Sequence, residues 1–295
     1  MILLAVSGGP DSMFMLNDQL KKYGNNQIVV AFVNYNQRSD SNIDQKIVED
    51  FCLKYHIQLE KLILSKQDYQ KNNFQEWARN KRYDFFYEIY TKYNCQKLLV
   101  AQHKDDFLET AIMQEKRKKV VNYYGIKKHS ILFKMNVERP YLFKFFKKEI
   151  EAKNKKNGIN FAIDYTNNSD KYERNAIRHL LEKSSNFYKN CLILKFRIKN
   201  KWLAIKAKRI ERIYKRWQSY IFSQDFFAKI RSEKDKLSLI YKLINEKFDG
   251  INLTKNKILS IIDFIISKNR TSTFLLKNNI FLVKKQGKLI FKFDN

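Results

Sequence analysis

A formal net charge of +28 over 295 residues is far more than solubility needs, and it indicates a polyanionic partner. Apolar residues make up 44% of the sequence, which is enough for a packed core and excludes a disordered chain. The three cysteines, Cys52, Cys95 and Cys191, are too isolated for a disulfide framework or a zinc ribbon, and they favour a reducing, cytoplasmic compartment. The sequence shows neither a signal peptide nor an uncharged apolar run of membrane-spanning length.

The first 110 residues alternate between strand-like and helix-like segments. The predicted strands are residues 2–6, 28–33, 59–64 and 97–101. The predicted helices are residues 13–23, 42–55 and 74–93, with another that opens over 106–114. This alternation predicts an α/β fold: a parallel sheet with helices on both faces, whose ligands bind at the carboxyl ends of the strands.

Beyond about residue 180 the pattern becomes mainly helical and strongly basic. Residues 196–221 predict one long helix, whose apolar stripe would contain Ile198, Trp202, Ile205, Ile213, Trp217 and Tyr220. Residues 255–268 predict another helix, and residues 271–276, 280–284 and 289–293 predict a small antiparallel sheet. We therefore expect an α/β domain over residues 1–182 and a basic helical domain with terminal strands over residues 183–295.

The positive charge is concentrated in the C-terminal part. Residues 1–180 hold 31 Lys and Arg against 21 Asp and Glu, whereas residues 181–295 hold 27 against 9. Residues 195–216 alone carry ten Lys and Arg and a single acid. A basic amphipathic helix of this kind binds an RNA backbone, a membrane surface or a partner helix, and a lysine-rich compositional bias is the remaining alternative.

A glycine-containing loop follows the first predicted strand and opens a helix: Ser7, Gly8, Gly9, Pro10, Asp11 and Ser12. Its two glycines let backbone N–H groups close around an anion, and the helix N-terminus adds partial positive charge. Because a GK[ST] sequence is absent, this is not the Walker loop of P-loop NTPases. We interpret the segment as a pyrophosphate-binding loop, with an ordinary glycine turn as the alternative.

Carboxylates and arginines recur at helical spacing near the other strand ends. Asp106 and Glu109 are three residues apart, so both can point into one cleft, where a lysine ammonium or a metal ion would have to lie between them. Asp at a helix N-terminus for dipole reasons is the alternative. Two arginine pairs suit phosphate binding, or else form a solvated face with ion pairs to neighbouring glutamates: Arg79 with Arg82, and Arg174 with Arg178.

The SGGPDS loop resembles the SGGxDS hallmark of the N-type ATP pyrophosphatases, and further segments resemble the tRNA(Ile)-lysidine synthases. Residues 32–41, FVNYNQRSDS, look like that family's HVNHGLRxxS stretch, and residues 102–110, QHKDDFLET, look like its HHxxDDxxET block. DYTN at 164–167 with RNAIR at 174–178 looks like DxTN…RNxIR, and ARNKRY at 78–83 resembles ARxxRY. The resemblance covers residues 2–180, continues more weakly over 271–293, and is to a short form of the family.

Three departures from the family pattern stand out. Asn36 occupies a glycine position, but asparagine is the next best residue for a left-handed turn, so we expect the turn to form. Gln102 replaces a histidine, which argues against a catalytic histidine at that position. Residues 114–128 contain only Gly125 where the family has an Arg- and Gly-rich loop.

The resemblance implies an ATP-dependent ligase that joins free L-lysine to C2 of the wobble cytidine in the CAU anticodon of tRNA(Ile). The reaction would pass through an adenylated cytidine and release pyrophosphate and AMP. ATP and Mg²⁺ would be required, with Asp11 helping to place the metal. A thiolase of the same loop family and a non-catalytic basic RNA-binding relative are the alternatives. Isolated cysteines argue against the first, and the intact SGGPDS and DDxxET motifs argue against the second.

The resemblance also assigns residues to roles. The expected catalytic residues are Asp11, Asp106, Arg174 and Arg178. The expected ATP-binding residues are Ser7, Gly8, Gly9, Pro10, Asp11, Ser12, Val33 and Arg79. Lysine would be bound by Asp106 and Glu109. RNA would be bound by Arg82, Lys206, Lys208, Arg209 and Arg212.

Overall fold

The computed structural model describes residues 1–36, 41–65, 68–69, 74–117, 121–162, 173–247, 254–277 and 280–293. Their contacts group the chain into two compact units, Met1–Asn200 and Lys201–Asn295. Helix α7 (Asn186–Ser219) contributes its first part to one unit and its second part to the other. A functional division after residue 182 stays a prediction, because the packing of the first unit extends to Asn200.

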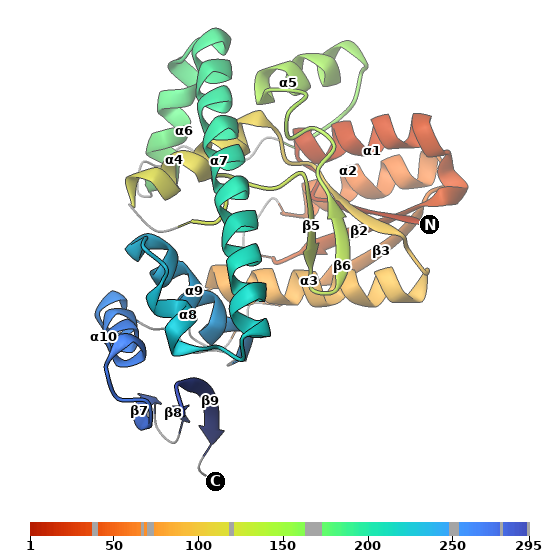
Figure 1. Ribbon diagram of the computed structural model, residues 1–295. Coiled ribbons are helices and arrows are strands. Elements are labelled where there is room, and N and C mark those ends of the chain that lie inside the picture. Colours follow the sequence, from red (N-terminus) through yellow and green to blue (C-terminus); the bar gives the residue numbers. More distant parts are fainter. Residues whose placement is uncertain are drawn as a thin grey trace. The chain divides into compact units, whose positions relative to one another are not determined.

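The first unit is built on a six-stranded sheet with the strand order β3-β2-β1-β4-β6-β5 (Figure 1). In chain order it contains β1 (Ile2–Val6), α1 (Pro10–Tyr23), the 3₁₀ helix η1 (Asn25–Gln27), β2 (Ile28–Asn34), α2 (Ser41–Lys54), β3 (Gln58–Ile63), α3 (Phe74–Lys92), β4 (Lys97–Val100), α4 (Lys104–Lys116), β5 (His129–Leu132), β6 (Met135–Glu138), α5 (Lys147–Lys156), α6 (Glu173–Lys183) and the start of α7.

The predicted α/β class is confirmed, with one addition at the edge of the sheet. Strands β3, β2, β1, β4 and β6 run parallel to one another, whereas the edge strand β5 pairs antiparallel with β6. The β5–β6 hairpin was not predicted, because both strands lie outside the alternation of strands and helices that was found in the first 110 residues.

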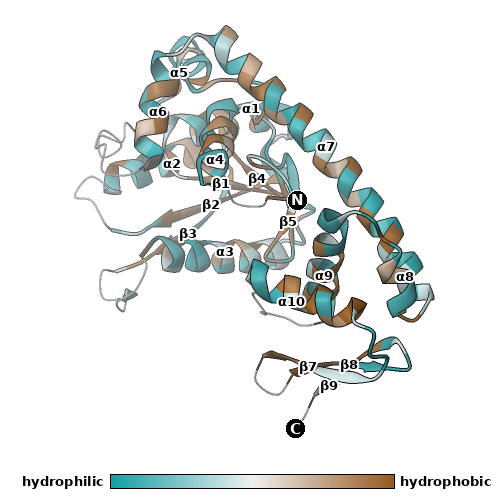
Figure 2. Cartoon of the chain, turned by 60° about the vertical axis from the view of Figure 1, so that its left-hand side comes forward, coloured by the Kyte–Doolittle hydropathy of each residue, from teal (hydrophilic) through white to brown (hydrophobic). Residues whose placement is uncertain are grey.

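Apolar side chains cover both faces of the sheet, as central parallel strands require. On β1, Leu4 and Val6 belong to a buried cluster with residues of α1 and α2, whereas Leu3 belongs to a cluster with residues of α3. Figure 2 shows α3 on one face of the sheet and α1 and α2 on the other. The period-two alternation within each strand therefore serves two cores at once.

The order of the strands places a crevice between β1 and β4. From β1 the chain moves outward through β2 to β3, and it then returns through α3 to β4 on the other side of β1. At such a switch point the connections leave neighbouring strands in opposite directions, which opens a crevice at their carboxyl ends. The loop of residues 7–12 follows β1, and residues 101–106 follow β4, so both candidate motifs lie at this crevice.

A third apolar cluster joins α4, α6 and the first part of α7. Phe107, Ile177, Leu181 and Phe196 are buried in it. The segment after α4 docks on the same helices, since Asn200 bonds both the amide and the carbonyl of Tyr124 through its side chain. This packing explains why the first unit continues beyond residue 182.

The second unit combines helices with a three-stranded antiparallel sheet in the order β7-β8-β9. After the second part of α7 it contains α8 (Gln224–Ala228), α9 (Glu233–Lys247), α10 (Lys255–Ile266), β7 (Ser272–Lys277), β8 (Ile280–Lys285) and β9 (Lys288–Phe293). The predicted basic helical region with terminal strands is confirmed, although α8 and α9 were not predicted. Among the helices that the structure describes, none has the length and apolar composition needed to cross a bilayer.

The apolar stripe predicted for the long helix is wrong in part. In the second unit the core receives Ile210, Tyr214 and Trp217, all buried, whereas Trp202 and Ile205 are exposed. The sequence pattern could not separate them, because apolar residues occur on two sides of this helix.

Two glycines with left-handed backbones allow a controlled test of the packing around α4. Gly125 has φ +78°, and an added Cβ would lie 2.5 Å from the Phe107 ring, whereas Gly158 has φ +62° and open space around it. Gly158→Ala should lower the free energy of unfolding by about 1–2 kcal/mol through backbone strain alone. Gly125→Ala should cost about 1–3 kcal/mol more, through overpacking. Urea unfolding followed by circular dichroism measures both, and equal losses would contradict the tight contact with Phe107.

Candidate active site

The loop between β1 and α1 is held closed by its second serine. Ser12 Oγ accepts a hydrogen bond from the Ser7 amide at 3.1 Å and donates one to the Gly9 carbonyl at 2.9 Å. Gly8 has φ +81°, and a Cβ there would lie 2.8 Å from the backbone oxygen of Asp44, so only glycine fits. The loop thus presents backbone N–H groups and the N-terminus of α1 at the crevice, an arrangement suited to phosphate.

A cavity of about 320 Å³ lies beside this loop. Its lining comes from the ends of β1, β2 and β4 and from α3, with apolar groups such as Phe86 and Val100 among the polar ones. Six of the eight residues expected to bind ATP line it: Ser7, Gly9, Asp11, Ser12, Val33 and Arg79. Of the other two, Gly8 shapes the loop and Pro10 lines a second cavity. A loop suited to phosphate therefore adjoins apolar side chains, an arrangement suited to a nucleotide.

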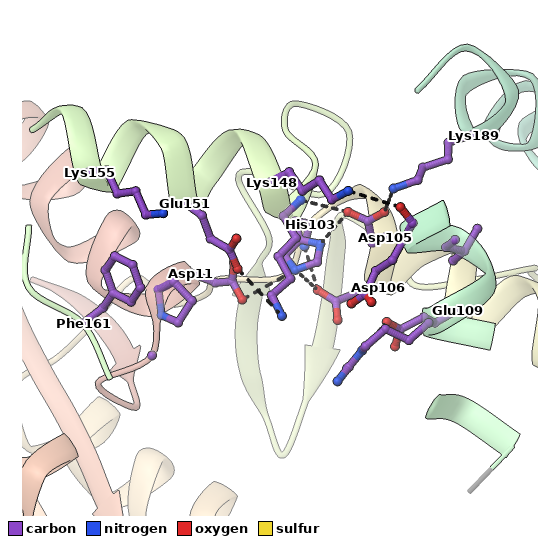
Figure 3. A pocket seen from close by; sticks show the side chains of 16 residues that line it. Asp11, His103, Asp105, Asp106, Glu109, Lys148, Glu151, Lys155, Phe161 and Lys189 are labelled. Atoms are coloured by element: carbon purple, nitrogen blue, oxygen red, sulfur yellow. Dashed lines mark hydrogen bonds and ion pairs between the residues drawn. The ribbon is translucent and has the colours of Figure 1, made fainter. Parts of the chain in front are cut away.

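One buried histidine lies among the carboxylates of the crevice (Figure 3). His103 Nε2 is 3.5 Å from Asp11 Oδ2 and 3.4 Å from Asp106 Oδ2, and its Nδ1 is 3.7 Å from Asp105 Oδ2. The side chain of His103 is only 5% exposed. Asp106 also accepts a hydrogen bond from the His103 amide at 2.9 Å, which caps α4. The ends of β1 and β4 thus bring Asp11 and Asp106 to one imidazole.

This arrangement makes His103 a cation at neutral pH. Burial alone would lower the pKa of His103, but the carboxylates of Asp106, Asp11 and Asp105 raise it to about 9. Burial raises the pKa of Asp106, and the imidazolium opposes that change. His103 was not among the residues assigned from the sequence. Its position at the N-cap of a helix whose first turn holds Asp105 and Asp106 is the signal that could have indicated it.

Glu109 lies between the two arginines of α6. Its side chain is 2% exposed, and its oxygens accept hydrogen bonds from Arg174 Nε at 2.8 Å and Arg178 Nε at 3.0 Å. Arg174 Nη2 is also 3.7 Å from Asp106 Oδ1. The predicted shared face of Asp106 and Glu109 is therefore present, but Glu109 has a role that the sequence did not reveal, because it positions both arginines.

A second cavity, of about 540 Å³, meets the first at Gly9, Asp11 and Asp106. Its lining is mixed in charge, since lysines of α5 join the acidic groups just described. Figure 3 shows Lys148, Glu151 and Lys155 along α5, with Lys148 near His103, Glu151 near Asp11 and Lys155 near Phe161. A cavity whose lining intersperses acids and lysines suits a polar substrate that carries both charges.

A buried ion pair connects the second cavity to α7. Lys189 Nζ donates to Asp105 Oδ1 at 2.8 Å, with side-chain exposures of only 5% and 11%. Asp105 Oδ2 also accepts the Lys147 amide at 2.8 Å, and the ammonium of Lys189 lies 5.0 Å from the centre of the Phe146 ring. Asp105 therefore fixes the start of α4 against both α5 and α7, and sequence reasoning had assigned it no role.

Comparisons with known proteins identify the family of the chain. A family model described as the PP-loop domain matches residues 1–184. The chain is 41% identical to the tRNA(Ile)-lysidine synthase of Mesomycoplasma hyopneumoniae over 98% of this chain and 95% of the relative. It is 42% identical to that of Mycoplasmopsis pulmonis over 96% of each. The chain belongs to the tRNA(Ile)-lysidine synthase family.

A solved structure supports the fold independently of the close relatives. The U34-tRNA thiolase of Methanococcus maripaludis is similar with a TM-score of 0.55 over 68% of this chain and 72% of the thiolase. Because only 16% of the aligned residues are identical, this likeness shows the shared fold alone.

Two departures from the lysidine synthase pattern have a structural account. Asn36 adopts φ +49°, which confirms the predicted left-handed turn, and its side-chain amide donates to the Leu64 carbonyl at 2.9 Å. Gln102 lines the first cavity and accepts a hydrogen bond from the buried Arg139 through its side-chain oxygen. Residues 164–167 of the DxTN-like block and residues 37–40 lie outside the described residues.

The residues expected to bind RNA fall into two places. Lys206, Lys208, Arg209 and Arg212 are exposed on α7 in the second unit. Arg209 pairs with the buried Asp235 at 2.5 Å, so its charge is already engaged. Arg82 instead lines the first cavity. Its guanidinium lies 5.7 Å from the Tyr83 ring centre, and that of Arg79 lies 4.7 Å from the same centre. Their roles in RNA binding stay predictions.

The cationic His103 predicts a pH dependence of stability. Because the folded chain holds this proton more tightly than the unfolded chain, protonation stabilises the fold fully below pH 6.5, and the stabilisation is lost as the pH rises through about 9. It is worth at most about 3 kcal/mol. The free energy of unfolding of the chelator-treated protein should fall over this window, as urea titrations would measure. His103→Gln should lack the decrease, and His129→Gln, on the exposed start of β5, should keep it. Matching profiles for the parent and His103→Gln would contradict the charge assignment.

Proposed function

We propose that the protein ligates free L-lysine to C2 of the wobble cytidine in a tRNA(Ile) with a CAU anticodon, through an adenylated cytidine. The observation that carries this proposal is the meeting of the two cavities at Gly9, Asp11 and Asp106. ATP in the first cavity and an acceptor in the second would face each other there. Membership of the lysidine synthase family makes the chain a tRNA-modifying enzyme that uses ATP. The proposal adds the amino acid, the intermediate and the products.

The proposed reaction has two displacements. First, O2 of the cytidine attacks the α-phosphorus of ATP, the bond from that phosphorus to its bridging oxygen breaks, and pyrophosphate leaves. Second, the neutral ε-amine of lysine attacks C2, the C2–O2 bond breaks, AMP leaves with that oxygen, and the nitrogen gives up a proton. The loop amides would bind the phosphates of ATP, and Val33 with Phe86 would contact its adenosine part.

The first displacement needs positive charge beside the phosphates. Arg79 lines the nucleotide cavity, and His103 holds a proton between Asp11 and Asp106. Arg174 is 47% exposed and is held by Glu109, so we assign it a contact with the α-phosphate as charge develops there. Glu109 would then act through the arginine, as a positioning residue.

Mg²⁺ fits the acidic side of the loop. Asp11 Oδ1 is buried and has no hydrogen-bond partner among the described residues, and carboxylate oxygen is the ligand that Mg²⁺ prefers. In the described part of the chain no three His, Cys, Asp or Glu side chains are grouped to hold a metal. Mg²⁺ would therefore take its other ligands from phosphates and water, as is usual for this ion. When bound, it would neutralise charge on the departing pyrophosphate.

Of the two carboxylates expected to bind lysine, Asp106 is the more accessible. Asp106 is 17% exposed, whereas Glu109 is 2% exposed and shared by two arginines. We therefore assign to Asp106 the contact with an ammonium group of the lysine substrate. The lysines of α5 that line the second cavity would receive the carboxylate of the amino acid.

Mass spectrometry of the tRNA after incubation with ATP and lysine tests the proposed function. Ligation adds the mass of lysine minus water, whereas a thiolase, the alternative that shares the fold, exchanges oxygen for sulfur. The cysteines argue against the thiolase: Cys52 and Cys95 are buried in clusters on opposite faces of the sheet, and Cys191 is exposed on α7. An unchanged tRNA mass in the presence of both substrates would overturn the proposal.

Asp11→Asn should slow pyrophosphate release at least about a hundredfold, because metal stabilisation of developing charge is worth several kcal/mol. The affinity for tRNA should stay within about twofold. Asp18→Asn on the same helix is the matched control. Its amide oxygen can still accept the hydrogen bond that the Tyr141 hydroxyl donates to Asp18 at 2.6 Å. A pyrophosphate assay and filter binding measure the two effects. Turnover of Asp11→Asn at the parent rate would remove Asp11 from the mechanism.

Asp106→Asn should raise the KM for lysine about ten- to a hundredfold, which is the loss of one charge-assisted hydrogen bond. The KM for ATP should change much less. Glu115→Gln is the control on the same helix, because Glu115 pairs with Lys195 at the surface and lines neither cavity. Steady-state kinetics with each substrate varied in turn would show this. A defect confined to ATP would instead assign Asp106 to the metal.

A further inference from the structure

Two apolar side chains project from the basic part of α7 in the second unit. Trp202 is 67% exposed and Ile205 is 58% exposed. Residues three apart on a helix lie on one face, so the indole and the branched side chain adjoin. A large apolar surface left in water is unfavourable unless a partner covers it, and a tryptophan carries the largest such surface of any side chain.

The fold of the second unit does not use Trp202. The core receives α7 through Ile210, Tyr214 and Trp217, which are buried on another side of the helix. Within the described residues the Trp202 indole makes no contact with another ring or with a cation. Tyr220 is also exposed, at 55%, but its ring stacks on Phe226 with 5.2 Å between the centroids. The exposure of Trp202 therefore needs a cause outside this unit's own packing.

Cations surround Trp202 and Ile205. Lys206 lies four residues after Trp202, Lys201 lies four before Ile205, and Lys208 lies three after it, so each borders the apolar pair. In the part of the chain that the structure describes, no carboxylate is within ion-pair distance of these three lysines. Because their charges are not neutralised internally, the surface is complementary to an anion.

We propose that Trp202 stacks on an unpaired base of the tRNA substrate, while Lys201, Lys206 and Lys208 bind the phosphates beside that base. Base stacking on an exposed aromatic ring, with lysines along the backbone, is how proteins hold single-stranded nucleic acid. The inference rests on the proposed function only in taking a tRNA as the partner. Ile205 extends the apolar surface next to the ring.

Other occupants fit this surface less well. A second copy of the chain would bring two sets of lysines together, with seven Lys and Arg against one acid in residues 201–216 of each copy. A membrane surface would match the lysines and the apolar face, which Ile198 continues at 47% exposure, but it offers no flat ring on which the Trp202 indole can stack. A polyanion whose bases also offer flat apolar surfaces satisfies both features.

Affinities for a tRNA transcript with a CAU anticodon, measured over a series of salt concentrations, test the inference. Trp202→Ala should weaken binding about five- to a hundredfold without changing the slope of log affinity against log salt, because stacking releases no counterions. Trp202→Phe should retain most of the affinity. Changing Lys206 and Lys208 to alanine together should make the slope shallower by about 1.4. Tyr241→Ala, on α9 and 45% exposed, is the control for loss of an exposed aromatic ring.

A base-paired RNA separates stacking from other effects. Trp202→Ala should not alter binding to an RNA duplex of equal charge, because paired bases cannot reach the indole. Equal losses on tRNA and duplex, an unchanged tRNA affinity, or a defect seen only in self-association or in binding to anionic vesicles would each overturn the inference. The mass of the tRNA product is read separately. A stacking defect without lysine addition would refute the proposed ligation alone, and lysine addition with unchanged affinity would refute the stacking alone.

Discussion

Several carboxylates converge at the carboxyl ends of two parallel strands, and each needs a positive neighbour. Like charges at these distances repel strongly when water is excluded, so an uncompensated cluster would raise pKa values or open the crevice. Here Asp11, Asp105 and Asp106 share His103, while Glu109 is held by two arginines of α6. The cations come from segments far apart in the chain. The acidic centre therefore draws α1, α4, α6 and α7 together.

The strand order creates the crevice, and the charged side chains determine the character of its two cavities. The switch point between β1 and β4 provides the crevice, and the loop with its required Gly8 provides backbone donors on one side of it. The acid cluster lies where the cavity beside this loop meets the cavity with the mixed-charge lining, at Asp11 and Asp106. The two displacements proposed above would use such a division, since ATP and the amino acid would then approach the same atoms from different sides.

The sequence predicted the parts of this site that are local. The strand–loop–helix pattern placed residues 7–12 correctly, and helical spacing placed Asp106 and Glu109 on one face. It could not show that Glu109 holds Arg174 and Arg178, since that pairing joins residues 65 and 69 positions apart. The importance of His103 was equally hidden, because its pKa depends on Asp11 from another strand end. In the second unit, spacing alone could not decide which apolar side of α7 enters the core.

The distribution of the cysteines has a practical consequence. Burial raises the pKa of Cys52 to about 12 and raises that of Cys95 as well, so neither thiol forms the reactive thiolate readily at neutral pH. Cys191 is exposed on the part of α7 that belongs to the first unit. A maleimide dye would therefore attach at a single natural position, two residues from the Lys189–Asp105 ion pair. The unaltered sequence thus carries its own spectroscopic attachment point for following events at the acidic centre.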